Sequence, residues 1–193
     1  MSEEKKFDPR KRKKLNNPVR LQWVPAMRVV ELMELNSHGT YLDVGAGTGY
    51  ISQAIGELLN GPIIHALDIE PLMISEMETT LKAASWIHPQ LMERNILSFA
   101  DQSVDGVWTI TVFHEFGDPL PILGEIYRVL RPGTALLVVD WAKQPEACEQ
   151  GPPLDHRVAE EVVVANLKEA GFTDVTIEDG FTHHYGVVGY RPR

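Results

Sequence analysis

The chain has 193 residues, of which 44% are hydrophobic, 23% charged and 8% aromatic, a composition typical of a globular domain with one packed core. It excludes a mainly disordered chain, and the 15 Gly and 13 Pro residues follow no collagen-like or solenoid period. No apolar run approaches the roughly 18 residues that span a bilayer. The charged N-terminus, which lacks the apolar stretch of a secretory signal, and the single Cys148 predict a cytoplasmic protein without disulfides.

The net charge of −9 is unevenly distributed along the chain. Residues 1–20 contain eight of the 18 Lys and Arg residues and three acidic residues, whereas the remainder carries a net charge of −14. This negative charge disfavours binding of nucleic acid to the surface of residues 21–193. We treat residues 1–17 as a basic arm, which is either a solvated leader or a contact for RNA, an anionic substrate or the chain's own acidic body. Residues 18–193 are expected to form one domain.

Hydrophobic periodicity and turn signals predict alternating helices and strands. In chain order we expect a helix over 18–35, a strand over 40–44, a helix over 50–59, a strand over 63–67 that ends at Asp68, a helix over 71–84, a weak strand over 89–92, a strand over 104–113, a helix over 119–130, a strand over 135–139, a helix over 155–170 and strands over 175–178 and 185–190. The alternation predicts a mostly parallel sheet with right-handed crossovers, and the last two strands would add an antiparallel edge. Ligands bind beyond the carboxyl ends of such strands, so the loops after residues 44, 67, 92 and 112 are the candidate site.

A glycine-rich turn follows the first predicted strand. In Asp43-Val-Gly45-Ala-Gly47-Thr-Gly49 the glycines allow close approach of a ligand and turns that are closed to other residues. The spacing departs from the dinucleotide fingerprint, because Tyr50 occupies the sixth position, and there is no phosphate-binding P-loop motif. Asp68 lies 23 residues after Gly45, close to the position of a ribose-binding acid, although it would also suit a cap for the helix that begins at Pro71.

This motif and Asp68 together resemble the class I, Rossmann-like S-adenosylmethionine-dependent methyltransferases. Further segments are similar in the same order, including 101–105, 113–119, 125–133, 138–141, 151–157 and 170–172, and they resemble small bacterial members related to the ubiquinone/menaquinone methyltransferase group. The resemblance covers about residues 20–190. It implies a three-layer α/β sandwich around a doubly wound, mostly parallel seven-stranded sheet, with S-adenosyl-L-methionine as the cofactor and S-adenosyl-L-homocysteine as the product.

The resemblance also implies a residue for each part of the cofactor. The methionine part would lie on the glycine-rich turn, at Asp43, Gly45, Ala46, Gly47 and Gly49, with Thr111 after the fourth strand. Asp68 would bind both ribose hydroxyls, because a carboxylate accepts two hydrogen bonds from a vicinal diol. Ile69 would be the apolar wall under the adenine, unless it only fills the core. Either Glu93 or Asn95 would accept a hydrogen bond from the adenine amino group.

Methyl transfer from a sulfonium needs little beyond in-line placement of the acceptor. A base helps where the acceptor is a hydroxyl or an acidic carbon. His114, next to Glu115 and directly after the fourth strand, is the candidate catalytic base, although a His at a strand end is often a hydrogen-bonded structural residue. Trp141 is placed either to line the acceptor pocket or to pack.

No metal site is expected. His183 and His184 are adjacent on a predicted strand and therefore point to opposite faces, and no acid or thiol lies at ligand spacing around them. His156 belongs to a segment that opens a predicted helix, where Asp155 is expected to be the cap.

We therefore expect transfer of a methyl group to a small-molecule acceptor by direct in-line displacement. The segment Val112-Phe-His-Glu115 differs from the Pro-Pro-aromatic motif of amine methyltransferases, which argues against that class. Cys148 does not follow a proline, as the nucleophilic cysteine of base-carbon methyltransferases does, which argues against that class as well. The alternatives are a non-catalytic S-adenosylmethionine-binding or regulatory module and an aminopropyltransferase on the same fold. Only about fifteen residues separate the fifth strand from the last helix, so the N-terminal helix and the basic arm are expected to cover the acceptor. The oligomeric state is left open.

Overall fold

The structure, a computed structural model, describes residues 7–144 and 151–193. Seven strands form one sheet in the spatial order β3-β2-β1-β4-β5-β7-β6. The strands are β1 (Thr40–Val44), β2 (Ile63–Asp68), β3 (Ile87–Leu91), β4 (Gly106–Ile110), β5 (Ala135–Trp141), β6 (Thr173–Glu178) and β7 (His184–Tyr190). The α-helices are α1 (Arg20–Trp23), α2 (Ala26–Leu32), α3 (Tyr50–Leu58), α4 (Pro71–Thr80), α5 (Leu120–Val129) and α6 (Glu160–Glu169), and 3-10 helices cover Pro9–Asn16, Phe113–Glu115 and Leu154–His156.

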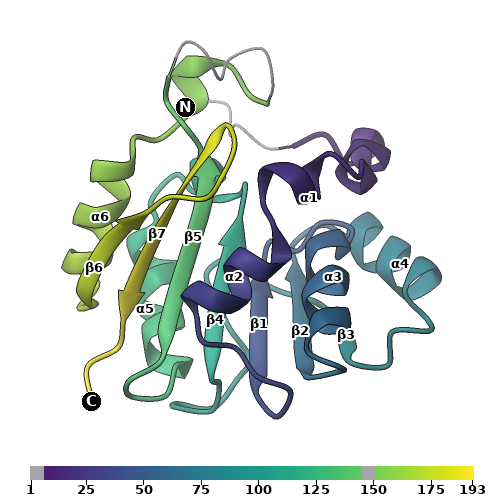
Figure 1. The fold of residues 1–193 in the computed structure, drawn as a ribbon, viewed down its shortest axis with the longest axis horizontal. Helices are drawn as coiled ribbons and strands as arrows, with labels where there is room; N and C mark the ends of the chain where they lie inside the picture. The colour runs from purple at the N-terminus through teal and green to yellow at the C-terminus, as the bar shows by residue number, and fades with distance from the viewer. Residues whose placement is uncertain (1–6, 145–150) are drawn as a thin grey trace.

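Helices lie on both faces of the sheet, which gives the three expected layers (Figure 1). Strands β1 to β5 pair in parallel, whereas β7 runs antiparallel to both β5 and β6. The predicted doubly wound sheet with an antiparallel C-terminal edge is therefore confirmed. Because β7 is antiparallel, its first residues, His184 and Tyr185, lie opposite Trp141 and Asp140 at the carboxyl end of β5.

The core consists of two layers, one on each face of the sheet. Alternate residues of a strand point to opposite faces, so Leu42 packs under α5 and α6, whereas Tyr41 packs under α2 and α3. Trp108 of β4 is fully buried on the α2 and α3 side. In the described parts of the chain, no helix combines the length and the apolar character needed to cross a membrane.

The helix expected over 18–35 is in fact two helices. Pro25 lacks an amide hydrogen and its ring disfavours a helical conformation at the residue before it, so α1 ends at Trp23 and Val24 is extended, with φ −126° and ψ 83°. Pro25 then caps α2. The break lets α1 leave the sheet face that α2 covers and lie near the carboxyl ends of the strands (Figure 1).

Several predicted boundaries also differ. Asp155 lies in a 3-10 turn, and Ala159 is the N-cap of α6, so the prediction that Asp155 caps this helix was wrong. The strand expected over 104–113 is limited to β4, because Thr111 has a positive φ of 61° and leaves the strand. Helix α4 stops at Thr80, four residues before the expected end at Ala84. Cys148 lies outside the described residues.

Candidate functional site

The turn between β1 and α3 has backbone angles that favour glycine. Gly45, Gly47 and Gly49 have φ values of +79°, +58° and +71°, a region that costs other residues about 1–2 kcal/mol. A Cβ on Gly45 would lie 2.7 Å from both γ-methyl carbons of Val112. The amides of Gly45 and Ala46 donate to the carbonyl oxygen of Leu67 at 2.8 and 2.9 Å. The turn is therefore held against the end of β2.

Asp68 connects the end of β2 to this turn. Its Oδ2 accepts the amide of Gly47 at 2.8 Å and its Oδ1 accepts the amide of Glu70 at 2.9 Å. Burial raises the pKa of Asp68, and the hydrogen bonds from the amides of Glu70 and Gly47 oppose that rise. The N-cap of α4 is Glu70, whose side chain accepts the amide of Leu72, so Asp68 is not the helix cap. Each carboxylate oxygen of Asp68 keeps a further lone pair for a ligand.

Asp43 lies beneath the glycine turn, with 3% of its surface exposed. Its Oδ2 accepts a hydrogen bond from the Ser52 hydroxyl at 2.6 Å. Burial raises the pKa of Asp43 to about 6, although Ser52 and the charge of Arg20 act in the opposite direction. The residue therefore supports the turn from the interior.

We expect Asp43→Asn to change how stability depends on pH. The folded-state pKa of about 6 exceeds the usual 3.8, so between these values the folded protein binds more protons than the unfolded chain. Asp43 alone therefore lowers the free energy of unfolding of the wild type by at most about 3 kcal/mol as pH rises from about 4 to about 6. The variant should lack this decrease in urea unfolding experiments. Ser52→Ala keeps the carboxylate and should keep the decrease; the same slope in Asp43→Asn as in the wild type would contradict the assignment.

Arg20 is a cation of the site that the sequence analysis did not single out. Its Nη1 donates to the carbonyl oxygen of Leu15 at 2.8 Å and its Nη2 to the hydroxyl oxygen of Thr111 at 3.3 Å. Burial lowers the pKa of Arg20, and the charge of Asp43 opposes this effect. Arg20 forms no ion pair with a carboxylate in residues 7–144 or 151–193. A partly buried guanidinium without a carboxylate is costly, which indicates a place for an anionic group of a ligand.

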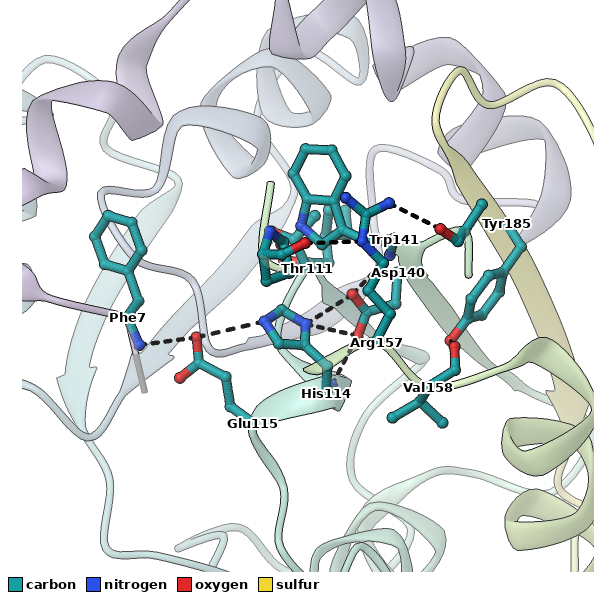
Figure 2. A network of polar contacts seen from close by, with 12 residues as sticks. Phe7, Thr111, His114, Glu115, Asp140, Trp141, Arg157, Val158 and Tyr185 are labelled. Carbon is teal, nitrogen blue, oxygen red and sulfur yellow. Dashed lines mark hydrogen bonds and ion pairs between the residues drawn. The ribbon is translucent and has the colours of Figure 1, made fainter. Parts of the chain in front are cut away.

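His114 lies in the 3-10 turn after β4 and faces Asp140 of β5 (Figure 2). Its Nδ1 is 2.8 Å from Oδ1 and 3.1 Å from Oδ2 of Asp140, and its backbone amide donates to Oδ2 at 2.8 Å. On the other side of the ring, Nε2 is 3.9 Å from Oε1 of Glu115. The same Oε1 accepts the backbone amide of Phe7 at 3.1 Å. Asp140, which completes this arrangement, was not among the residues expected from the sequence.

Trp141 belongs to an aromatic cluster next to His114 and Asp140. Its ring centroid lies 4.1 Å from that of His184 and 5.9 Å from that of Trp23, and the Arg157 guanidinium lies 5.3 Å from it. Burial lowers the pKa of His184 to about 4, so its ring is neutral at physiological pH. Trp141 packs in this cluster.

A cavity of about 270 Å³ opens at the same edge of the sheet. It is lined by Ala142, Gln144, Glu160, Phe181, His183, His184 and Tyr185. A second cavity of about 300 Å³ lies near Met33, Asp105 and Gly133, at the opposite ends of the strands, away from the glycine turn. Within the described residues, no group of three or more His, Cys, Asp or Glu side chains is arranged to hold a metal ion.

The loops after β2 and β3 form the other end of the site. Ile69 is 42% exposed, so it does not fill the core. The amide of Met92 donates to the carbonyl oxygen of Asp68 at 2.9 Å, which holds the following loop with Glu93 and Asn95 close to the end of β2. Asn95 has a positive φ of 59°. The structure therefore leaves both Glu93 and Asn95 near the place expected for an adenine ring.

The described part of the basic arm lies over the glycine turn. Oδ1 of Asn16 accepts the Thr48 hydroxyl at 2.5 Å, and a Cβ on Gly47 would lie 2.9 Å from a methyl carbon of Leu15. Arg12 forms an ion pair with Glu76 of α4 at 3.0 Å. Of the roles considered for the arm, contact with the chain's own acidic body is the one seen for these residues.

A doubly wound sheet with a glycine turn after β1 and an acid at the end of β2 defines a Rossmann-like, nucleoside-binding α/β protein. Residues 42–138 match the family model described as a methyltransferase domain. The chain belongs to this methyltransferase family, whose members use S-adenosylmethionine.

Similar proteins agree with this assignment. A demethylmenaquinone methyltransferase of Thermus thermophilus is 29% identical over 128 residues, which are 65% of this chain and 57% of that protein. A malonyl-[acyl-carrier protein] O-methyltransferase of Coxiella burnetii is 38% identical over 96 residues, 50% of this chain and 31% of that protein. The chain thus spans about half the length, or less, of these curated relatives. A crystal structure of a SAM-dependent methyltransferase from Aquifex aeolicus has a TM-score of 0.87 at 28% identity and covers 95% of this chain and 98% of that one.

Proposed function

We propose that this chain is an S-adenosylmethionine-dependent methyltransferase that transfers a methyl group to a small-molecule acceptor by direct in-line displacement. The observation that carries the proposal is the bond between the Gly47 amide and Asp68, which joins the glycine turn to the acid at the end of β2. This arrangement offers a backbone cradle and a carboxylate to a ligand with a ribose diol. The relative named for demethylmenaquinone supports a small-molecule acceptor.

The side chains around the turn fit each part of the cofactor. Asp68 has free lone pairs for the two ribose hydroxyls. The exposed Ile69 offers an apolar surface to the adenine, and Glu93 or Asn95 would accept a hydrogen bond from the adenine amino group. Arg20 would bind the α-carboxylate of the methionine part, because its guanidinium has no carboxylate partner among the described residues. When bound, the cofactor supplies a methyl group already activated on a sulfonium.

We expect Arg20→Met to discriminate between ligands with and without the carboxylate. Loss of charge-assisted hydrogen bonds worth about 1.5–3 kcal/mol should weaken S-adenosylmethionine about 10- to 100-fold. The affinity for decarboxylated S-adenosylmethionine should change by less than about threefold. Calorimetric titration measures both. Arg28 lies on α2 and pairs with Glu178 of β6, so Arg28→Met is the matched control. An equal loss of affinity for both ligands in Arg20→Met would contradict the assignment.

The first test of the function is calorimetric titration of the full chain with S-adenosylmethionine, S-adenosylhomocysteine and NADH. Micromolar binding of the first two and not of NADH would support the proposal. If neither S-adenosylmethionine nor S-adenosylhomocysteine bound, the proposal would be overturned. Release of S-adenosylhomocysteine with an acceptor would separate a methyltransferase from a non-catalytic or regulatory module. Turnover only with the decarboxylated cofactor would identify an aminopropyltransferase instead.

A further inference from the structure

The carboxylate of Asp140 determines which nitrogen of His114 carries hydrogen. An ionised carboxylate only accepts hydrogen bonds, so Nδ1 of His114, 2.8 Å from Oδ1, must be the donor. The neutral ring therefore has its lone pair on Nε2. Asp140 itself is held in place, because it is 1% exposed and also accepts the amides of His114 and Trp141. The position and the tautomer of the ring are thus both fixed by one buried group.

The free nitrogen points away from Asp140 and toward Glu115. Nε2 faces Glu115 at 3.9 Å (Figure 2). Burial raises the pKa of Glu115, and the charge of His114 and the hydrogen bond from the Phe7 amide oppose that rise. Nε2 therefore lies on the side of the ring away from Asp140, just beyond the carboxyl end of β4, where such sheets bind their ligands.

We propose that Asp140 positions His114 as a base whose Nε2 accepts the proton of the acceptor hydroxyl, and that the acceptor is a neutral phenol or enol. The inference rests on the proposed function. As the hydroxyl oxygen forms its bond to the methyl carbon, the carbon–sulfur bond breaks and its electron pair stays on sulfur, leaving a neutral thioether. The hydroxyl proton goes to Nε2. Asp140 stabilises the resulting imidazolium and does not itself take the proton.

The arrangement favours a hydroxyl over the other common acceptors. A phenol has a pKa of about 10 and is neutral at physiological pH, so its attack is helped by a base within reach. A thiol, with a pKa of about 8.5, is partly ionised without help, and an uncharged amine attacks through its own lone pair. A fixed histidine with a buried carboxylate behind it is useful chiefly for the first class.

The charged groups around His114 set the pH range in which it can act. Burial lowers its pKa, but the hydrogen bond and charge of Asp140 and the charge of Glu115 outweigh this effect. Arg157, on the loop before α6, acts in the opposite direction. The net result is a pKa above the usual 6.5, so the neutral, basic form of His114 predominates only above that pH.

The decisive experiment is NMR of the imidazole nitrogens of the full chain without ligands. We expect hydrogen on Nδ1 of His114 and a pKa above 6.5, which should fall by about one unit or more in Asp140→Asn. Asp118→Asn makes the same chemical change at an exposed carboxylate before α5, which accepts the amide of Leu120, and should leave the pKa of His114 unchanged. Hydrogen on Nε2, or the same His114 pKa in Asp140→Asn as in the wild type, would overturn the proposal.

Activity tests the chemical class. With S-adenosylmethionine, transfer to 4-methylphenol, which is neutral at pH 8, should fall by about 10²- to 10⁴-fold in Asp140→Asn. Transfer to 4-nitrophenol, which is already ionised, should fall by less than about tenfold. Equal losses for both phenols, or transfer only to mercaptoethanol or ethanolamine, would overturn it. Failure of S-adenosylmethionine binding would instead reject the proposed function and leave the NMR result as it is.

Discussion

Asp68→Ala is expected to weaken the binding of S-adenosylmethionine by at least about 100-fold in calorimetric titration. The substitution removes the acceptor of two hydrogen bonds from a ribose diol, each worth about 1.5–3 kcal/mol when the acceptor is charged. It also releases the Gly47 amide, which now donates to Oδ2 at 2.8 Å, so the glycine turn loses its connection to β2. Asp68→Asn keeps one carbonyl oxygen and should have an intermediate affinity.

Glu70 is the matched control for this prediction. It lies two residues after Asp68, but its side chain caps α4 by accepting the amide of Leu72. Glu70→Ala should therefore cost about 1 kcal/mol of stability and change the affinity by less than about threefold. If instead Glu70→Ala weakened the cofactor as much as Asp68→Ala does, the ribose site would not be where we place it.

Gly45→Ala is expected to abolish cofactor binding and to lower the free energy of unfolding by about 2–4 kcal/mol, because strain at positive φ adds to overpacking. The new Cβ would lie 2.7 Å from both γ-methyl carbons of Val112. The turn cannot easily move away from Val112, since the Gly45 amide donates to the carbonyl oxygen of Leu67. Urea unfolding and calorimetry measure the two effects.

Two further variants separate the causes of this loss. Val112→Ala in the Gly45→Ala background removes the steric conflict and leaves the φ of +79°, so it should restore part of the stability. Gly124→Ala places a methyl group on α5 with no heavy atom within 4 Å and should stabilise the helix by up to about 1 kcal/mol. Wild-type affinity in Gly45→Ala would show that the turn does not need glycine at this position.

The placement of the candidate cofactor residues was predictable because the signals for it are local. The glycine turn and Asp68 each directly follow an apolar strand, and parallel strands bring these ends together at one edge of the sheet. The acceptor side was only partly predictable. His114 was identified by its place after β4, but nothing in hydrophobic periodicity reveals that Asp140, 26 residues away, hydrogen-bonds to it. The bond between Arg20 and Thr111 spans 91 residues and was hidden for the same reason.

Other differences came from local effects that compete with periodicity. Apolar residues recur through 18–35 as in one helix, yet Pro25 divides the segment, because a proline restricts its predecessor and offers no amide. Asp155 looked like a helix cap by residue type, but the chain forms a separate turn there and begins α6 at Glu160. Residue type indicates where a cap is favourable and does not determine which of several nearby turns uses it.

The antiparallel placement of β7 has a consequence for how the protein is made. The turn and the acid of the cofactor side lie within residues 40–68, so they leave the ribosome early and need only short-range pairing. The acceptor side is complete only when Tyr185 pairs with Asp140, a contact across 45 residues that includes the last strand synthesised. Contacts between distant residues form late because closing the chain between them costs entropy. We therefore expect the glycine turn and Asp68 to come together at an earlier stage of synthesis than the pairing of Tyr185 with Asp140.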